Sequence, residues 1–290
     1  QKQDSNIQIR LNLNQMYEKY RNGEHLQDLL EDIRDVLENE DREFDLNRLA
    51  DYDYAKEHLF VKISKIEGRE DVLKDVPYEK KEDLALTYHI LVEQEAGGIS
   101  SAMITNSIMK IYGIDQEQLH KDAIENSPKI LPAKVMSVGS MLLNSLEKDG
   151  EDVDVNIRSA LEGESSSMLT IVTNEVGIEG AATLFYPELM EKLSDQFGDY
   201  FILPSSIHET LILPDDGFMS VTMLKNMVTE INETQVMENE RLTNEVYHYD
   251  SKEHVFERAD KFKARKMAKS NMRAFEENTQ KSKKTHEISL

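Results

Sequence analysis

The residues with the clearest chemical potential lie at one polar corner of the sequence, between two apolar segments. The corner spans residues 204–209 and contains Ser205, Ser206, His208 and Glu209. A hydroxyl, an imidazole and a carboxylate are the groups of a nucleophilic triad, in which the base activates the hydroxyl and the acid orients the base. Side chains alternate along an extended chain, so Ser206 and His208 share a face while Glu209 points away. A hydrolase would therefore need an acid from elsewhere.

The same corner has a structural interpretation, which we favour. The Gly-x-Ser-x-Gly turn that holds a nucleophile under strain does not occur in this sequence. Serine hydroxyls and an imidazole between two strands can instead satisfy backbone groups. We therefore expect a polar corner with a structural role, and keep a hydrolase that uses Ser205 or Ser206 with His208 as the alternative.

The sequence predicts no metal site and no cofactor. His208-Glu209 lacks the second histidine four residues on that a zinc-binding His-Glu-x-x-His helix requires. The acidic residues of 149–154 and Asp215-Asp216 lack the spacing of a calcium-binding EF-hand loop, so we expect solvated loops. None of the glycines belongs to a complete phosphate-binding motif.

Charge is distributed unevenly along the 290 residues, whose formal net charge is −22. Residues 252–290 carry 11 Lys/Arg and 6 Asp/Glu, which leaves 23 against 50 in the first 251 residues. So acidic a body repels phosphate backbones, which argues against nucleic-acid binding outside the tail. The absence of cysteine and of long apolar runs favours a cytoplasmic protein that does not enter a membrane.

The basic tail is the second candidate for function. It interleaves aromatic and basic residues at helical spacing, and the candidate contact residues are Phe256, Phe262, Lys263, Arg265 and Lys266. Such a helix can dock on its own acidic body, bind an acidic protein partner or nucleic acid, or remain solvated. A protein partner or self-association is the interaction we expect, with nucleic acid possible for the tail alone.

Apolar periodicity predicts interspersed helices and antiparallel hairpins, an α+β fold without βαβ regularity. The predicted strands are 7–13, 59–66, 84–93, 99–105, 130–138, 168–172, 200–203 and 210–213. The predicted helices are 14–21, 24–39, 45–58, 106–112, 115–127, 139–147, 180–197 and 220–233, with a basic amphipathic helix in the tail.

Local signals set several of these boundaries. Thr105 is a predicted helix N-cap, and Gly113 ends that helix. The next helix is predicted to end before Pro128, because the residue before proline avoids the α region. Residues 148–166 are polar and poorly periodic, so we expect a loop or insertion there, which would separate two sub-lobes of one domain over residues 1–250.

A set of short motifs resembles the domain-of-unknown-function family 5688 (DUF5688), which is common in anaerobic gut bacteria. In chain order the motifs are Asp51-Tyr52-Asp53, Leu73-Lys74-Asp75-Val76-Pro77, Ile104-Thr105-Asn106, Ala123-Ile124-Glu125-Asn126-Ser127-Pro128, Gly180-Ala181-Ala182, Tyr186-Pro187, Ile202-Leu203-Pro204-Ser205-Ser206-Ile207-His208-Glu209, Leu213-Pro214-Asp215-Asp216-Gly217 and Asn232-Glu233-Thr234-Gln235-Val236. The resemblance covers about residues 5 to 250, and it implies that an N-terminal helix and strand of the family are missing here. It implies no reaction or catalytic residue, since kinship does not fix function.

The sequence thus favours a non-enzymatic protein-interaction or regulatory module, with residues 251–290 as a basic helical tail. A hydrolase at the corner and nucleic-acid binding through the tail are the two alternatives.

Overall fold

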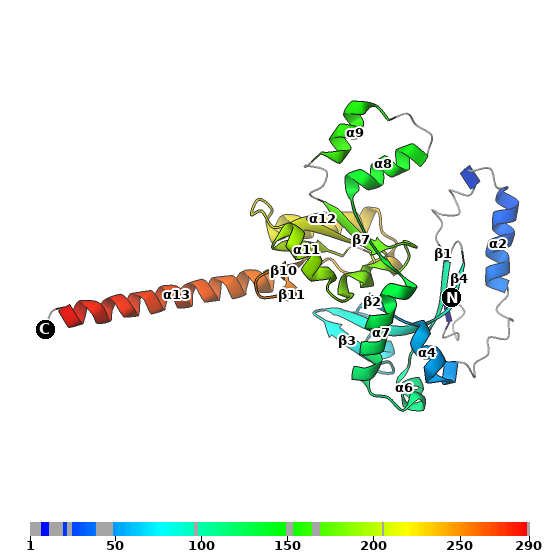
Figure 1. Cartoon of the computed structure of the whole chain (residues 1–290), viewed down its shortest axis with the longest axis horizontal. Helices are drawn as coiled ribbons and strands as arrows, with labels where there is room; N and C mark the ends of the chain where they lie inside the picture. Colours follow the sequence, from blue (N-terminus) through cyan, green and yellow to red (C-terminus); the bar gives the residue numbers. More distant parts are fainter. Residues whose placement is uncertain are drawn as a thin grey trace.

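The structure is a computed structural model of the whole chain, which describes residues 7–11, 20–21, 25–38, 49–95, 98–148, 153–163, 169–204 and 206–288. Two antiparallel sheets form the body, and a long C-terminal helix extends away from it (Figure 1). The α+β class predicted from the sequence is confirmed. Most of the predicted helix 14–21, the turn at 96–97 and Ser205 lie outside the described residues.

The first sheet, sheet A, is built from the N-terminal half of the chain. Its strands are β1 (Ile7–Leu11), β2 (Leu59–Lys65), β3 (Tyr78–Lys81), β4 (Leu84–Glu95) and β5 (Gly98–Met103). Their order is β1-β5-β4-β2, with β3 also paired to β4. The predicted hairpin corresponds to β4 and β5, and the register shifts between Leu91 and Glu93.

The helices of the same half are α2 (Leu26–Glu38), α4 (Tyr52–His58), α5 (Glu70–Leu73), α6 (Asn106–Tyr112) and α7 (Gln116–Ile130). Of these, α7 packs on β2 and β4, and α4 packs on β4. The Thr105 side chain caps α6, which ends at Gly113 with a φ of 68°, so both predicted signals are confirmed. The predicted end of α7 before Pro128 is wrong. The helix continues to Ile130 because Ser127 bonds back to the Ala123 carbonyl and also receives the Val61 N–H of β2.

The second sheet, sheet B, has the order β11-β10-β8-β9-β7-β6. Its strands are β6 (Ala133–Ser137), β7 (Thr170–Asn174), β8 (Tyr200–Leu203), β9 (Thr210–Pro214), β10 (Tyr247–Asp250) and β11 (Val255–Arg258). The first four correspond to predicted strands. The sequence prediction did not include β10 and β11, which are four residues each and too short to show a period.

Two segments between strands differ from the prediction. The sequence predicts a loop or insertion at residues 148–166, and the structure shows that this segment contains a helix, α9 (Val155–Glu162), which starts at an Asp154 cap. It follows α8 (Val138–Lys148), and both helices project beyond sheet B (Figure 1). The single helix expected over 180–197 is divided, because Pro187 and Glu188 separate the 3₁₀ helix η2 (Gly180–Phe185) from α11 (Leu189–Phe197).

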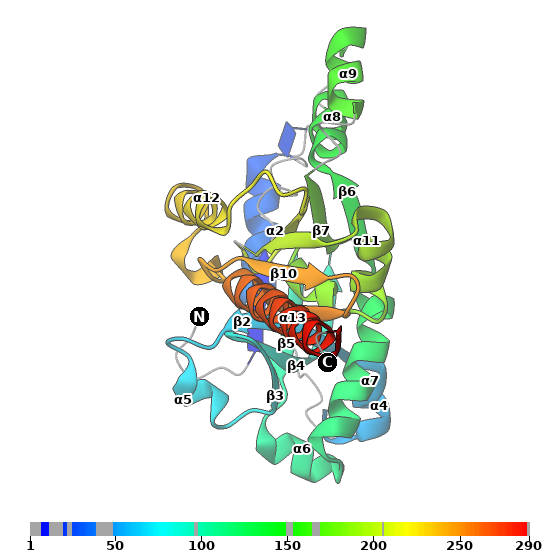
Figure 2. The same cartoon turned by 90° about the vertical axis from the view of Figure 1, so that its left-hand side faces the viewer.

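The C-terminal part adds α12 (Val221–Thr234), the short η3 (Glu238–Glu240) and α13 (Ala259–Ile288). Strand β11 pairs with β10, so sheet B continues to Arg258 and α13 starts directly from its edge. Viewed nearly along its axis, α13 emerges in front of β10 (Figure 2).

One apolar core joins the two sheets. Its largest cluster contains Leu59, Val61 and Ile63 of sheet A together with Ile202 and Tyr247 of sheet B. The single domain over residues 1–250 stays a prediction. No helix in the described part of the chain has the length and apolar character needed to cross a membrane.

Candidate functional site

A buried polar face on sheet A marks the first candidate site. Lys62 of β2 lies directly opposite Thr87 of β4, and Phe60 lies opposite His89. Since alternate residues of a strand share a face, Lys62, Thr87 and His89 point to the same side of the sheet. All three are buried. Polar groups are normally excluded from such positions unless they have partners, so this face needs an explanation.

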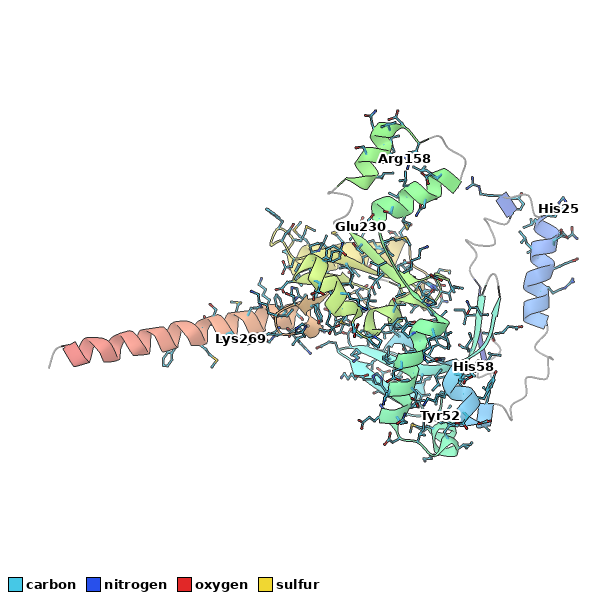
Figure 3. All side chains as sticks on the ribbon, viewed as in Figure 1. His25, Tyr52, His58, Arg158, Glu230 and Lys269 are labelled. Carbon is cyan, nitrogen blue, oxygen red and sulfur yellow. The ribbon has the colours of Figure 1, made fainter. Side chains whose placement is uncertain are left out.

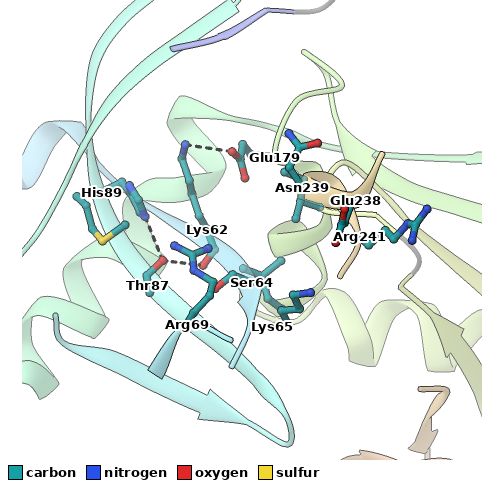
Figure 4. A pocket seen from close by; sticks show the side chains of 13 residues that line it. Lys62, Ser64, Lys65, Arg69, Thr87, His89, Glu179, Glu238, Asn239 and Arg241 are labelled. Carbon is teal, nitrogen blue, oxygen red and sulfur yellow. Dashed lines mark hydrogen bonds and ion pairs between the residues drawn. The ribbon is translucent and has the colours of Figure 1, made fainter. Parts of the chain in front are cut away.

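The polar face forms one wall of a cavity of about 540 Å³. Figure 4 shows Lys62, Arg69, Thr87 and His89 on one side and η3 with its neighbours on the other. The lining residues are Lys62, Ile63, Ser64, Lys65, Arg69, Thr87, His89, Met103, Glu179, Ile207, Glu238, Asn239 and Arg241. Strands of sheet A supply most of one wall, and the segments around η2 and η3 supply the opposite wall.

A buried ion pair connects the two walls. The Lys62 ammonium lies 3.2 Å from the Glu179 carboxylate, and the two side chains are 5% and 4% exposed. Glu179 immediately precedes η2, and its backbone adopts the left-handed conformation, with a φ of 55°. Its backbone N–H donates to His208 Nδ1 at 3.3 Å. Glu179 is therefore held both through its carboxylate and through a strained backbone conformation.

His89 belongs to the buried part of this polar face. Its Nε2 is 3.0 Å from the Thr87 hydroxyl, while its Nδ1 has no hydrogen-bond partner among the described residues. The same is true of the buried Ser64 hydroxyl. Burial lowers the pKa of His89 well below its ordinary value, and the positive charges of Lys62 and Arg69 lower it further. His89 is therefore a neutral imidazole at physiological pH.

Neutral buried histidines make stability depend on pH. Burial also lowers the pKa of His120 and of His248. A pKa lowered in the folded state means that the unfolded chain takes up protons first, so stability is complete above the unfolded pKa and falls as the pH decreases toward the folded pKa. Between about pH 7.5 and about pH 5.5, we expect His89 to contribute a loss on the order of 1 kcal/mol.

Chemical denaturation at several pH values measures this loss. His89→Asn is expected to flatten the slope of unfolding free energy against pH, whatever it does to stability at neutral pH. His25→Asn, at an exposed histidine beside α2 (Figure 3), is the control and is expected to leave the slope unchanged. Equal slopes in wild type and His89→Asn would contradict the prediction.

The polar corner at residues 204–209 adjoins this cavity. Ser206 Oγ accepts the backbone N–H groups of His208 at 3.1 Å and Glu209 at 3.3 Å, and lies 3.4 Å from the Glu209 carboxylate. The His208 ring contacts the Glu179 N–H and, through Nε2, the Glu240 carboxylate at 3.4 Å. Within the described residues, no hydrogen bond joins the Ser206 hydroxyl to this ring. The described geometry therefore does not pair Ser206 with His208, while Ser205, the other hydroxyl of the hydrolase alternative, lies outside the described residues, so that part stays a prediction.

The corner has a positioning role next to the cavity. Ile207 lines the cavity. Its backbone carbonyl accepts a hydrogen bond from the Ala181 N–H of η2, and its own N–H donates to the Glu240 carbonyl of η3. The His208 carbonyl accepts the Thr173 hydroxyl of β7 at 2.8 Å. The corner thus ties β7, η2 and η3 together and fixes the wall opposite Lys62.

The C-terminal helix is the second candidate site, and its first turns are anchored on the body. The Phe262 ring stacks on the buried His248 ring with centroids 3.5 Å apart. Phe256 belongs to β11 and stacks on Tyr247, with its edge against Phe185. Both aromatic residues among the predicted contact residues therefore make their contacts within the chain itself.

Three basic residues anchor the same turns to acidic groups. Arg265 pairs with the fully buried Asp250 at 2.9 Å, with Glu257 at 2.5 Å and with Glu253. Burial alone would raise the pKa of Asp250, but the Arg265 hydrogen bond and the backbone N–H groups of Glu253 and Lys252 outweigh it and lower that pKa. The Lys266 ammonium lies 3.4 Å from Asp250, and Lys269 pairs with Glu253 at 2.5 Å. Lys263 is exposed.

The structure gives no indication of a metal centre in the part of the chain that it describes. No group of three or more His, Asp or Glu side chains is placed to hold an ion there. Asp215 and Asp216 accept the backbone N–H groups of Gly217 and Phe218, as in a turn. Residues 149–152 lie outside the described residues.

Sequence interpretation missed the cavity, although part of it has a signal. Lys62 and Ser64 alternate with apolar residues in one predicted strand, and Thr87 and His89 do so in the next. Two paired strands with polar residues at matching positions indicate a polar sheet face. Arg69 and Glu179 come from loops and have no such pattern.

The fold and sites define an α+β protein with a polar cavity between its sheets and an anchored C-terminal helix. The model of a family of unknown function, DUF5688, matches residues 1–251. The chain belongs to this family. Comparison with curated proteins and with solved structures gave no significant match.

Proposed function

We propose that the chain is a non-enzymatic protein-interaction module in which α13 carries the partner-binding surface. The observation that carries this proposal is the contrast between the two parts of α13. Its first turns are held by Phe262 and Arg265, whereas Met267, Met272 and Phe275 are 60%, 64% and 73% exposed. Figure 1 shows the helix projecting from the body beyond its anchor.

Two of the three exposed apolar residues of α13 lie on the side of the helix away from its anchor, and the third lies beyond the anchored turns. At about 100° per residue, Met267 and Phe275 each lie about 140° from Phe262 around the axis, whereas Met272 lies about 80° from it, on the side of Arg265 but about two turns further along the helix. A rigid anchor and an outward apolar face suit helix-in-groove recognition, because the helix enters the partner already ordered and loses little conformational entropy. Methionine side chains also adapt to irregular grooves.

We infer that the groove belongs to an acidic protein. The tail carries 11 Lys/Arg and 6 Asp/Glu, and Arg265, Lys266 and Lys269 use part of that charge on the body. Opposite charge would steer the partner toward the projecting part. Nucleic acid is the alternative ligand for the tail, and it would give an affinity that falls steeply with salt.

Compartment and source are inferred as well. We propose a cytoplasmic protein of anaerobic gut bacteria. The cysteine-free sequence supports the compartment, and the family resemblance supports the source.

Site-specific photo-crosslinking in the native host tests the interaction. A photoreactive residue at Met272 is expected to capture an acidic protein that the same residue at Met223 of α12 does not capture. With that protein purified, Met267→Ser/Met272→Ser is expected to weaken binding at least about tenfold, because buried apolar anchors carry most interface energy.

The control is Met223→Ser/Met227→Ser, which changes two exposed methionines on α12. It is expected to leave the affinity unchanged. The same captured proteins at both helices, or an unchanged affinity for the α13 variant, would contradict the proposed surface. If the only protein crosslinked at Met272 is a second copy of this chain, α13 mediates self-association and the proposal of a separate acidic partner is wrong.

A further inference from the structure

We propose that the cavity between the two sheets binds a small organic anion, whose phosphate or carboxylate group lies beside Lys62, Arg69 and His89. Nothing in the family description assigns a ligand to this protein, and the cavity is separate from the partner surface on α13. The inference rests on the charge of the cavity, its buried polar groups and its size.

The cavity reverses the charge of the rest of the body. Lys62, Lys65, Arg69 and Arg241 line it against Glu179 and Glu238. In the first 251 residues, by contrast, 50 acidic residues face 23 basic ones. A cation-rich recess in an acidic protein focuses its field on a small anion while the surrounding surface repels large polyanions.

The buried end of the cavity brings two cations to one histidine. The positive charges of Lys62 and Arg69 both act on His89, and Glu179 lies 3.2 Å from the Lys62 ammonium. Arginine matches the geometry of carboxylate and phosphate oxygens with two parallel donors. An oxyanion at this end would therefore interact with both cations in a place where water screens charge poorly.

Two uncharged groups of the polar face lack partners within the described residues. Ser64 Oγ and His89 Nδ1 are buried and have no hydrogen-bond partner among the residues described. Such groups are costly in a folded protein and are often completed by a ligand or an ordered water. They lie on the same face of sheet A but four residues apart in register, because His89 is opposite Phe60 and Ser64 is opposite Ala85. Different atoms of one extended ligand, or a ligand together with an ordered water, would therefore complete them.

The size of the cavity favours an organic ligand over a simple ion. A volume of about 540 Å³ is within the range of small-molecule sites, and far exceeds that of inorganic phosphate. The wall opposite Lys62 carries Glu238 and Asn239, which can bond hydroxyl or amino groups of the ligand body (Figure 4).

Titration of the full chain with defined probes tests the proposal. The probes are AMP for a phosphate, citrate for carboxylates, inorganic phosphate for the bare ion and adenosine for the body without the anion. Calorimetry gives the affinity, and the imidazole resonances of His89 report binding at the site. We expect AMP or citrate to bind with a Kd of about 1 mM or tighter, and adenosine at least tenfold more weakly.

Two variants connect binding to the site. Arg69→Gln is expected to weaken the anionic probe at least about tenfold, since a charge-assisted hydrogen bond is lost. Lys65→Gln, at the exposed rim, is expected to weaken it less. Arg158→Gln removes the same charge on α9 (Figure 3), which contributes no residue to the lining of the cavity, and is expected to change nothing.

The outcomes separate the alternatives. Tighter binding of AMP assigns a phosphate, and tighter binding of citrate assigns carboxylates. The proposal is overturned if no anionic probe moves the His89 resonances at about 10 mM. Equal weakening by Arg69→Gln and Arg158→Gln would also overturn it, because it would show general charge attraction.

Discussion

Replacing Gly180 with alanine is expected to destabilise the protein by about 3 kcal/mol, because the position has no space for a side chain. A Cβ atom there would lie 2.2 Å from Thr173 Oγ1, 2.3 Å from the His208 carbonyl oxygen and 2.8 Å from the Asn174 nitrogen. Two of these atoms are backbone, so rotating a side chain cannot relieve the contact. The alanine would push η2 away from β7 and from the polar corner.

Denaturant unfolding measures the effect, with the slope of the transition showing whether the folded state stays compact. Gly68→Ala is the matched control. Gly68 has a φ of +74°, but a Cβ atom at this position would have no described atom within 4 Å. Alanine there therefore costs only the left-handed backbone, about 1 kcal/mol. Similar losses for both variants would contradict the steric explanation.

Measuring Gly180→Ala in a second variant, Thr173→Ala, shows which neighbouring atom limits the packing. Thr173→Ala removes the side-chain oxygen that lies nearest to the new methyl group, but the His208 carbonyl remains. We therefore expect Gly180→Ala to be nearly as destabilising in the Thr173→Ala background as in wild type. Full rescue would show that the hydroxyl, and not the backbone of the corner, limits this packing.

The parts of the fold that the sequence predicted well depend on local chemistry. The Thr105 and Asp115 side chains cap their helices, and the Gly113 turn needs only its own backbone. Strand β2 starts at the predicted residue, and α12 starts one residue after its Ser220 cap. Caps and alternation act within a few residues, so they can be recognised without tertiary information.

The errors arise where distant residues override a local preference. Pro128 should end α7, but the last turn of this helix is held by β2 and by the residues that lead into β2. Asn126 donates to the Glu57 and Leu59 carbonyls, and Ser127 accepts the Val61 N–H. These contacts join residues that are far apart in the sequence. They offset the backbone hydrogen bond that proline cannot make.

The candidate sites show the same division. Alternation in β2 and β4 contains the information that Lys62, Thr87 and His89 share a face. The corner was recognised as polar, but its use was not predictable, because His208 meets Glu179 and Glu240 only when three distant connections of sheet B come together. In the tail, the residues that anchor α13 and those that are exposed have similar composition. Their side of the helix and their distance from β10 separate them, and neither is set by composition.

Replacing Lys62 with methionine is the other change expected to have a large effect, roughly 3–5 kcal/mol. Methionine keeps the length and apolar character of the lysine stem but removes the ammonium that lies 3.2 Å from Glu179. The buried carboxylate then loses a counter-ion in a place that water reaches poorly. Breaking one side of a buried pair costs more than the pair contributes, because the remaining charge stays desolvated.

Lys192→Met provides a control with the same chemistry and geometry. Lys192 and Glu188 are also 3.2 Å apart, but on the surface of α11, where such pairs contribute about 0–1 kcal/mol. Equal losses at Lys62 and Lys192, measured by denaturant unfolding, would show that burial does not set the cost.

The double variant Lys62→Met/Glu179→Gln distinguishes charge from packing. If the loss at Lys62 comes from the uncompensated carboxylate, the neutral amide should recover a large part of it, so the double variant is more stable than Lys62→Met alone. If it comes from packing against Phe60, over whose ring the ammonium lies at 5.6 Å, no recovery is expected. Recovery of stability in the double variant would mean that the Lys62 ammonium serves to balance the Glu179 carboxylate, which is buried in the cavity wall. An incoming anion would then meet a wall whose buried acid is neutralised, instead of a bare carboxylate that repels it.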